Sequence, residues 1–366
     1  MITKPCFSTS LTTFVISAAL LLGPAPVYAH TRYNIVDLGK LVRSAGPQNG
    51  AMAINDRGQV VGGNSGHGFL WTDGKAVDLG TLPPVSVEDN TVEAAYGINN
   101  KEQIVASSGS FGPIFMSGLQ FARGVLIENR EARQFTHHNS SFIPYAINDS
   151  GEIVGLDGYR GFFYAHGKFI QLGTLSKVPN GNYSTARNIN QKGQVVGWTT
   201  VSIGSGTNRN KLADHAFLWQ RGMNEGRMRD LGTLSGTSGS EAYSINNKGE
   251  VVGAADGYAG RTSGDFADNH AQAFLWRSGK MMSLGLLPGG KSCEAFGIND
   301  NTAIVGSCDA RAFLWHNGKM TDLNDNLLPA SGWVLEEAQA VNNPGQIAGI
   351  GTFNGEEHLF LLTPAG

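Results

Sequence analysis

The sequence lacks the features that identify a membrane protein or a common enzyme class at first sight. Its 366 residues include only three cysteines, and no segment beyond the first 29 residues is apolar enough to anchor the chain in a membrane. It has no P-loop, no HExxH, no GxSxG and no zinc-type cysteine spacing. Helix-type apolar periodicities are few, whereas glycine (50 residues), β-branched and aromatic residues are abundant, so an all-β fold is predicted.

The first 29 residues have the order of a secretory signal peptide. Lys4 precedes an apolar run over residues 11–22, and the small residue Ala29 ends a segment that suits signal peptidase. The run is too short to cross a bilayer, and a buried N-terminal helix is the alternative. We therefore predict a signal peptide over residues 1–29, a single mature domain over residues 30–366, and a secreted protein, extracellular or periplasmic.

Charge argues against a nucleic-acid partner. The chain has 27 basic and 30 acidic residues, and removal of Lys4 with the signal peptide leaves 26 against 30, a net charge of −4. This balance is too mild for a nucleic-acid footprint. The two remaining cysteines, Cys293 and Cys308, favour a disulfide in an exported chain, with two free thiols as the alternative. No metal and no cofactor is predicted.

An internal repeat dominates the mature chain. Each copy reads small-x-x-Ile-Asn-x-x-Gly-x-Val-Val-Gly, then a variable loop, then x-Ala-Phe-Leu-Trp-x-x-Gly-x-x-x-Asp-Leu-Gly. Four short runs separated by turn residues are typical of a four-stranded propeller blade. The seven copies predict a seven-bladed β-propeller, and their asparagines are spaced 42 to 56 residues apart: Asn55, Asn99, Asn148, Asn190, Asn246, Asn299 and Asn342.

The repeated asparagine begins a hairpin turn, where its side chain bonds nearby backbone, and the glycine three residues later supplies a positive φ. Copies two and six have Glu102 and Thr302 in place of that glycine. We expect the turns of these two copies to differ from the others.

The two ends of the chain complement each other. The seventh copy stops at residues 361–364 without a fourth strand, whereas residues 33–39 form a fourth strand ahead of the first copy. The N-terminal strand is therefore predicted to complete the last blade and close the ring, which removes an exposed edge. An open solenoid is the alternative, but it would require atypical capping repeats. A monomer is expected.

Three segments of the sequence resemble those of a known protein family. The sequences at residues 215–217 (His-Ala-Phe), 230–234 (Asp-Leu-Gly-Thr-Leu) and 244–253 (Ser-Ile-Asn-Asn-Lys-Gly-Glu-Val-Val-Gly) resemble the bacterial extracellular repeat proteins of the HAF family. The resemblance covers nearly all of the mature chain, and copy two departs from it most, at residues 123–127. It implies export and a repeat β fold, and it provides no catalytic residues.

Each blade is predicted to hold a donor opposite an acceptor on its third and fourth strands. Counting residues across the turn at residues 72–74 places His67 opposite Asp78. The same count, applied to the first two strands of copy six, places Cys293 opposite Cys308 within reach of a disulfide. Because the pattern recurs in every blade, a structural cross-strand pair is favoured over catalysis or metal binding. The other pairs are His215 with Asp230, Arg311 with Asp322, His358 with Asp37, Arg123 with Gln134, Arg160 with Gln171, and Gln272 with Ser283.

We expect a functional site where the repeat is broken, on the face that carries the loops between strands two and three and between blades. An acidic arc, defined as Glu93, Glu241, Glu294 and Glu337, precedes four of the inner strands. It could bind a cation or a basic group, or supply acid and base carboxylates. Solvated charges at loop ends are the alternative.

Three loops are further candidates. Two of them are long loops, at residues 199–213 and 256–270, and Asp214 adjoins the first. They bring Tyr, Arg and His side chains near acidic residues, a combination that would suit a lyase or hydrolase. The alternative is that they are flexible insertions with no catalytic role. Their candidate ligand-binding residues are Asp214, Tyr258, Arg261 and His270. The apolar insertion at residues 111–121 is either a lid or contact surface, or packs on its own blade.

These patterns predict a secreted binding or scaffold protein whose ligand, a carbohydrate or a protein, lies on the loop face at the mouth of the channel. The alternative is an extracellular polysaccharide lyase or hydrolase that uses the same face. Some polysaccharide lyases are seven-bladed propellers, which is an analogy of fold alone.

Overall fold

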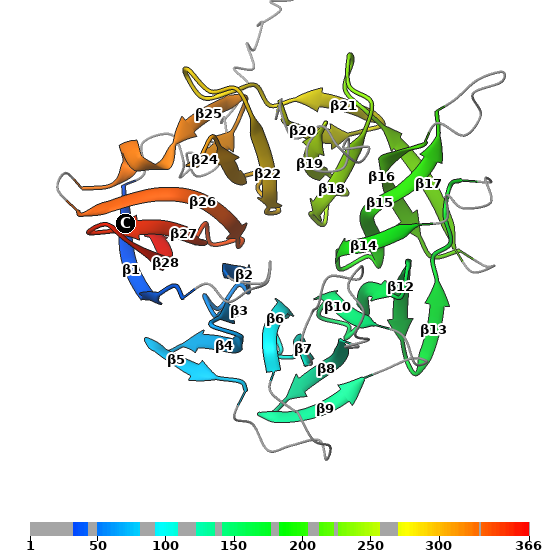
Figure 1. Cartoon of the computed structure of the whole chain (residues 1–366), viewed down its shortest axis with the longest axis horizontal. Coiled ribbons are helices and arrows are strands. Elements are labelled where there is room, and N and C mark those ends of the chain that lie inside the picture. The colour runs from blue at the N-terminus through cyan, green and yellow to red at the C-terminus, as the bar shows by residue number, and fades with distance from the viewer. Residues whose placement is uncertain are drawn as a thin grey trace, which may run out of the picture.

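A computed structural model shows seven four-stranded antiparallel sheets arranged as blades around a central channel, which confirms the predicted seven-bladed β-propeller (Figure 1). The structure describes residues 32–42, 50–80, 92–108, 122–135, 141–176, 183–203, 212–222, 226–256, 270–328 and 331–365. The predicted signal peptide lies outside these ranges. Within them, no helix is long and apolar enough to cross a membrane.

Every blade is built from four strands that run from the channel to the rim. The innermost strands are β2 (Gly50–Ile54), β6 (Val92–Ile98), β10 (Phe142–Ile147), β14 (Ser184–Ile189), β18 (Ser240–Ile245), β22 (Cys293–Ile298) and β26 (Trp333–Val341), which begin blades 1 to 7 in this order. The second strands are β3 (Val60–Asn64), β7 (Ile104–Ser108), β11 (Ile153–Asp157), β15 (Gln194–Ser202), β19 (Val251–Ala255), β23 (Ile304–Cys308) and β27 (Ile347–Phe353).

The third strands carry the Ala-Phe-Leu-Trp motif and the fourth strands form the rim. The third strands are β4 (His67–Thr72), β8 (Arg123–Glu128), β12 (Arg160–Ala165), β16 (Leu212–Gln220), β20 (Gln272–Arg277), β24 (Arg311–His316) and β28 (Glu356–Pro364). The outermost strands are β5 (Lys75–Asp78), β9 (Glu131–Phe135), β13 (Lys168–Gln171), β17 (Arg227–Gly232), β21 (Lys280–Ser283), β25 (Lys319–Asp322) and β1 (Tyr33–Lys40). A short 3-10 helix, η3 (Leu323–Asn326), follows β25.

The N-terminal strand closes the ring, as predicted. β1 pairs antiparallel with β28, from Tyr33 opposite Pro364 to Lys40 opposite His358, so the last blade has the order β1-β28-β27-β26. The first and last strands lie side by side in Figure 1. Closure therefore leaves no unpaired blade edge between the first and last copies.

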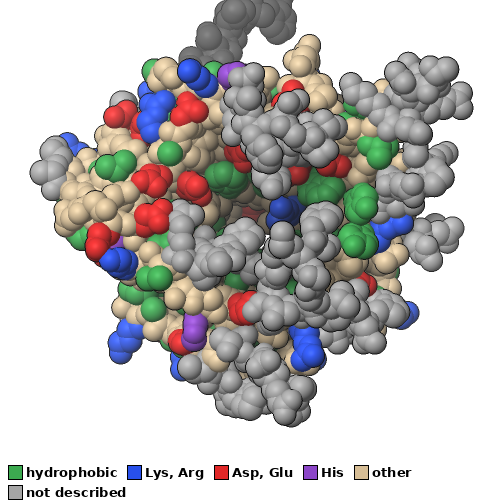
Figure 2. All heavy atoms as spheres, viewed as in Figure 1, with side chains coloured by type: hydrophobic (Ala, Val, Ile, Leu, Met, Phe, Trp, Pro, Cys, Tyr) green, Lys and Arg blue, Asp and Glu red, His purple; other side chains and the backbone are tan. Residues whose placement is uncertain are grey.

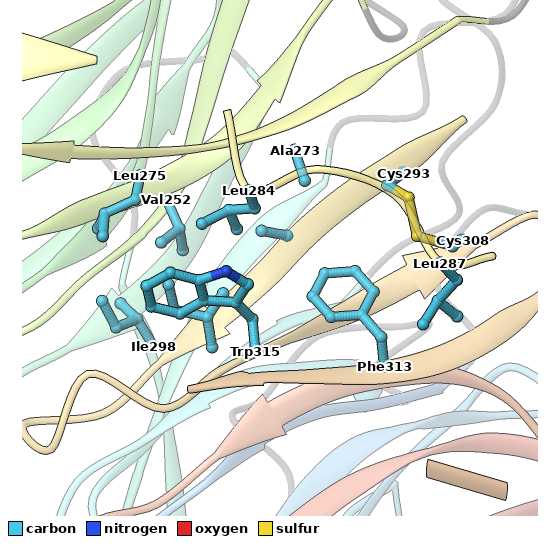
Figure 3. Close-up of a cluster of buried hydrophobic side chains, with 12 residues drawn as sticks. Val252, Ala273, Leu275, Leu284, Leu287, Cys293, Ile298, Cys308, Phe313 and Trp315 are labelled. Atoms are coloured by element: carbon cyan, nitrogen blue, oxygen red, sulfur yellow. A yellow bond between two sulfur atoms is a disulfide. The ribbon is translucent and has the colours of Figure 1, made fainter. Parts of the chain in front are cut away.

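The hydrophobic core lies between neighbouring blades. The Phe of the repeated motif is fully buried in most blades, as at Phe217, Phe274, Phe313 and Phe360. Between blades 5 and 6, Phe313 and Trp315 of β24 face Leu275 and Leu284 of the preceding blade (Figure 3). Burial of such side chains contributes about 2 kcal/mol each, so the repeated apolar residues hold adjacent blades together.

The same core holds the disulfide. Cys293 of β22 and Cys308 of β23 are directly paired in the strand register, and their Cα atoms are 4.1 Å apart in a disulfide between two fully buried residues. The predicted bond is confirmed.

Two rings of hydrogen bonds run around the channel at the turns that end the inner strands. In the first ring, the side-chain amide of each repeated asparagine, here called a belt asparagine, donates to the backbone carbonyl of the next belt asparagine at 2.9–3.1 Å. Asn342 donates to the carbonyl of Asn55 and so completes the circle. The repeated asparagine therefore joins blades, in addition to its expected bonds within its own turn.

The second ring is formed by the residue after each belt asparagine. Its backbone N–H donates to the side chain at the same position of the next blade at 2.8–3.0 Å, and Asn343 donates to Asp56 to close this ring as well. An amide or carboxylate oxygen at this position satisfies an N–H that the turn would otherwise leave unpaired.

The prediction that the turns of copies two and six differ is wrong. Glu102 and Thr302 adopt φ of 62° and 61°, and their N–H groups donate to the belt asparagine carbonyl at 3.1 and 3.0 Å, as glycine does in the other blades. Their side chains bond to neighbouring blades, where Glu102 accepts from Gln59 at 2.8 Å and Thr302 donates to Glu250 at 2.7 Å. These bonds offset the backbone strain of a side chain in the left-handed region.

Four of the seven predicted donor–acceptor pairs on strands three and four form, but their predicted register is wrong by two residues. Asp78 lies directly opposite Phe69, and His67 reaches it diagonally with Nδ1 3.2 Å from the carboxylate. Each Asp of the three histidine pairs also accepts from the N–H of the glycine two residues later, which draws it toward the end of the strand. The other closest contacts are 3.0 Å for His215–Asp230, 2.9 Å for His358–Asp37 and 3.5 Å for Arg311–Asp322.

The remaining three predicted pairs show the same offset. Gln134 lies opposite Val125 instead of Arg123, Gln171 opposite Phe162 instead of Arg160, and Ser283 opposite Phe274 instead of Gln272.

Candidate functional site

A cavity of about 820 Å³ occupies the channel and is lined by residues of all seven inner strands. Figure 2 looks onto this hollow and shows acidic, basic and hydrophobic side chains around it. Much of the lining comes from one position of the repeat, the third residue before the belt asparagine, here called the channel position. Its occupants are Met52, Tyr96, Tyr145, Arg187, Tyr243, Phe296 and Gln339.

A β-bulge directs the channel position inward. The pairing of each inner strand with its neighbour shifts register at this residue, for example between Ala242 and Ser244 around Tyr243. A bulged residue has no direct partner on the next strand, so its side chain can be re-aimed, here into the channel. The same shift occurs in all seven blades.

The glycine that ends the Val-Val-Gly motif makes room for this bulge. A Cβ atom added to Gly253 would lie 1.9 Å from the backbone oxygen of Glu241, and the corresponding glycines of five other blades have the same conflict at 1.9–2.0 Å. In blade 2 the position is Ala106, and there the inner strand contains an additional register shift, between Val92 and Ala94. The repeated glycine is thus required by the close approach of two backbones.

Arg187 and three tyrosines form a cluster in the channel. The guanidinium of Arg187 lies 5.0 Å from the ring centre of Tyr145, within cation–π range. Tyr145 and Tyr96 pack edge to face at 5.5 Å, and the Tyr96 hydroxyl lies 3.2 Å from that of Ser107. The Nε atom of Arg187 is buried and has no hydrogen-bond partner among the described residues.

Glu241 is the most unusual acid of the channel. The residue is only 6% exposed, and this burial is the main reason that the pKa of its carboxyl is raised to about 7. The nearby charge of Arg187 lowers this pKa, whereas the charges of Asp214 and Glu294 raise it. Burial and the nearby carboxylates also raise the pKa of Tyr243, whose hydroxyl donates to Glu294 at 3.4 Å. The phenol of Tyr243 is therefore protonated at neutral pH and acts as a donor, not as a base.

The cavity lining is negative overall. Among the described residues, six carboxyl groups line it, from Asp56, Asp149, Glu241, Glu294, Asp300 and Glu337, against the guanidinium of Arg187. Such a lining favours a cationic or hydroxyl-rich ligand over a polyanion. Within the described residues, no group of three or more His, Cys, Asp and Glu side chains is placed to hold a metal ion.

The structure brings most of the acidic arc to the channel. Glu241, Glu294 and Glu337 line the cavity, with Glu294 and Glu337 half-buried, so Glu241 is not the solvated charge that the alternative proposed. Glu93 lies half-buried in the extra bulge of β6, where its charge acts on Tyr96.

Two of the loop candidates can be placed. Asp214 is half-buried in β16, accepts from the Thr200 hydroxyl at 3.1 Å, and has a pKa raised by burial. His270 is exposed just before β20 and is not part of the cavity lining. Tyr258, Arg261 and the insertion at residues 111–121 lie outside the described residues.

Sequence reasoning missed Arg187 and the three tyrosines of the channel. The available signal was that the channel position varies among aromatic, basic and amide side chains, whereas its neighbours in the repeat are nearly constant. Nothing in the spacing of the sequence indicates that this residue is bulged into the channel.

No protein-family model and no curated protein matches the chain in sequence. Among solved structures, the chain is similar to the extracellular domain of a B. thetaiotaomicron protein assigned to one-component systems, with 10% identity and a TM-score of 0.50 over 90% of this chain and 40% of that one. The β-propeller domain of the trilobed protease from Pyrococcus furiosus matches at 9% identity and a TM-score of 0.47, over 90% of this chain and 93% of that one.

An ulvan lyase, a polysaccharide lyase, matches at 11% identity and a TM-score of 0.43, over 90% of this chain and 94% of that one. The first of the three structures is much longer than this chain, which spans two fifths of its length. At these identities the similarity shows the fold alone. The strand topology assigns the chain to the β-propeller fold, in a seven-bladed form.

Proposed function

We propose that this protein is an exported β-propeller that binds a ligand in the mouth of its central channel. The observation that carries the proposal is the cluster of Arg187, Tyr145, Tyr243 and Glu241 on bulged and neighbouring positions of the inner strands. These side chains surround a cavity large enough for a small molecule or the end of a chain.

Export is supported by two features. The disulfide between Cys293 and Cys308 is a bond that persists in oxidising compartments, and the N-terminal sequence has the order of a signal peptide. Release from the cell and retention in the periplasm are both compatible with these features.

A binding screen tests the proposal. Purified residues 30–366 would be screened against a glycan array and against secreted proteins, and the binders measured again with Arg187→Ala and Tyr243→Phe. We expect the two variants to lose about tenfold or more in affinity, because each removes a donor from a partly desolvated site. Met282→Ala, a change to an exposed side chain of the outer strand β21, serves as the control and should bind normally.

Unchanged affinity in both channel variants, with normal folding, would contradict a site in the channel. Loss of affinity in Met282→Ala as well would show that the effect is not specific to the channel.

A second candidate function is hydrolysis or lysis of a polysaccharide at the same place. A buried carboxyl with a pKa of about 7 suits a general acid, and Glu294 lies in the same cavity as a second carboxylate. Incubation with plant and bacterial polysaccharides would reveal new reducing ends for a hydrolase or unsaturated ends for a lyase. Turnover that disappears in Glu241→Gln would favour this function, whereas intact glycans after prolonged incubation would exclude it for the substrates tried.

A further inference from the structure

Two tyrosines at the boundary of blades 3 and 4 present their rings to solvent. Tyr159 is 57% exposed and Tyr183 is 45% exposed, although both are large aromatic side chains. Their ring centres are 5.5 Å apart and their planes meet at 86°. We call this pair the tyrosine platform. In an exposed aromatic pair, apolar ring faces are in contact with water, and a ligand that stacks on the rings removes these faces from water.

The backbone of the platform is fixed by hydrogen bonds between the two blades. The carbonyl of Tyr159 accepts from the N–H of Ser184 at 3.1 Å, which ties blade 3 to the start of β14. The carbonyl of Tyr183 accepts from the N–H of Thr200 at 3.0 Å and from the hydroxyl of Thr199 at 3.1 Å. A binding surface held in this way loses little conformational entropy when a ligand docks.

The platform lies at one end of the channel. Tyr183 directly precedes β14, the inner strand that carries Arg187 four residues later. Glu241 and Glu294 lie at the start of the inner strands of the next two blades, so Tyr183 lies at the same end of the channel as these two acids. The Thr200 hydroxyl donates to Asp214 beside Tyr183, and the charge of Asp214 acts on Glu241. The two rings therefore lie at the same end of the ring of blades as Glu241 and Glu294, outside the lining of the cavity itself.

We infer that the tyrosine platform is a stacking subsite for an oligosaccharide of neutral or amino sugars, whose chain extends into the channel. A pyranose ring has an apolar C–H face that packs on an aromatic ring, and its hydroxyls donate to carboxylates such as that of Asp214. The negative lining of the channel disfavours uronic acid polymers. This inference rests on the proposed function, because it assigns a ligand class to the same site.

Three hexasaccharides test the ligand class by isothermal titration against residues 30–366. They are a β-1,4-linked N-acetylglucosamine hexamer, its fully deacetylated form and an oligogalacturonate of the same length. We expect the first two to bind and the oligogalacturonate to bind at least tenfold more weakly. Equal binding of the oligogalacturonate would overturn the charge selection, and failure of both other hexamers to bind would overturn the sugar subsite.

Variants separate the platform from the channel. Tyr159→Ala and Tyr183→Ala should each weaken binding of the hexamers by about fivefold, because each removes one stacking ring, without a change in melting temperature. Leu286→Ala is the matched control, since Leu286 is 47% exposed at another blade boundary and should have no effect.

If the two tyrosine variants bind the hexamers like the unmodified chain while Arg187→Ala does not, the platform is wrong and the channel site stands. If no hexamer binds but a lysine-rich peptide binds in an Arg187-dependent manner, the carbohydrate assignment is overturned and the channel site again stands. If the hexamers depend on both tyrosines but not on any channel residue, the proposed channel function fails.

Discussion

Glu241 differs in charge from the residues at the same position of the repeat in the first four blades. The corresponding positions in blades 1 to 4 are Gly50, Ala94, Ile143 and Thr185, none of which is charged. Glu241 faces the channel beside Arg187 with almost no solvent contact, so its ionisation is opposed by burial and supported by one cation. A residue in this state couples the charge of the cavity to pH near neutrality.

Glu241 should lower the stability of the fold as the pH rises. In the folded protein the Glu241 carboxyl retains its proton up to a pH of about 7, whereas in the unfolded chain it releases the proton near the ordinary glutamate pKa of 4.5. The free energy of unfolding should therefore decrease between about pH 4.5 and 7, by an amount on the order of 3 kcal/mol in total. Urea denaturation at pH 5 and pH 8 measures the change. Glu241→Gln should reduce this pH dependence, and an identical dependence in the variant would contradict the assignment.

At the scale of the strand, the bulge of the inner strand explains both a predicted feature and a missed one. The repeated Val-Val-Gly was recognised from the sequence, but its physical reason, the approach of the carbonyl of the preceding inner strand, became clear only from the fold. The register of the third and fourth strands was misjudged by two residues because residues 72–75 form the turn with Thr72 opposite Lys75, a pairing that turn composition alone does not determine.

The bulge gives a prediction for the repeated glycine. Gly253→Ala should reduce the free energy of unfolding by about 2–3 kcal/mol, because its Cβ has no room beside the Glu241 carbonyl. Ala106→Gly in blade 2 is the matched control, with an expected loss of about 1 kcal/mol or less. Chemical denaturation measures both values, and a tolerated Gly253→Ala would contradict the proposed reason for the motif.

The hairpin of β22 and β23 offers a second prediction at this scale. The cysteines are separated by 15 residues in sequence, so removal of the bond by Cys293→Ala with Cys308→Ala should cost about 2–3 kcal/mol. Denaturation with and without a reductant measures the loss. The reductant should destabilise only the unmodified protein, and an equal response of the double variant would show that the bond is not responsible.

At the scale of the whole molecule, the closed ring depends on the two termini and on the belt asparagines. The number of blades and their closure followed from the sequence because the copies could be counted and the first and last segments complement each other. The belt itself did not follow, since six of its bonds span 42 to 56 residues of sequence and the closing bond spans 287, and they become visible only once the blades are placed around a channel.

The channel cluster was hidden for a related reason. Tyr145, Arg187 and Tyr243 come from three consecutive blades, and the curvature of the ring brings them around one cavity. The acidic arc was recognised because three of its members share one position of the repeat.

The belt gives a prediction for the molecule as a whole. Asn190→Asp keeps the acceptor oxygen but removes the amide that donates to the carbonyl of Asn246 at 3.0 Å and to Gln194 at 2.8 Å. A buried carboxyl against two acceptors should cost about 3 kcal/mol or more. Asn301→Asp at an exposed turn position should change stability by less than about 0.5 kcal/mol. Thermal and urea unfolding measure both, and equal effects would contradict a structural belt.

The central claim, a ligand site in the channel, is tested most directly by hydrogen–deuterium exchange of residues 30–366 with and without the tightest binder of the screen. The expected result is slower amide exchange in the inner strands around Arg187, Glu241 and Glu294, with little change in the outermost strands. Protection confined to the outermost strands would contradict the claim.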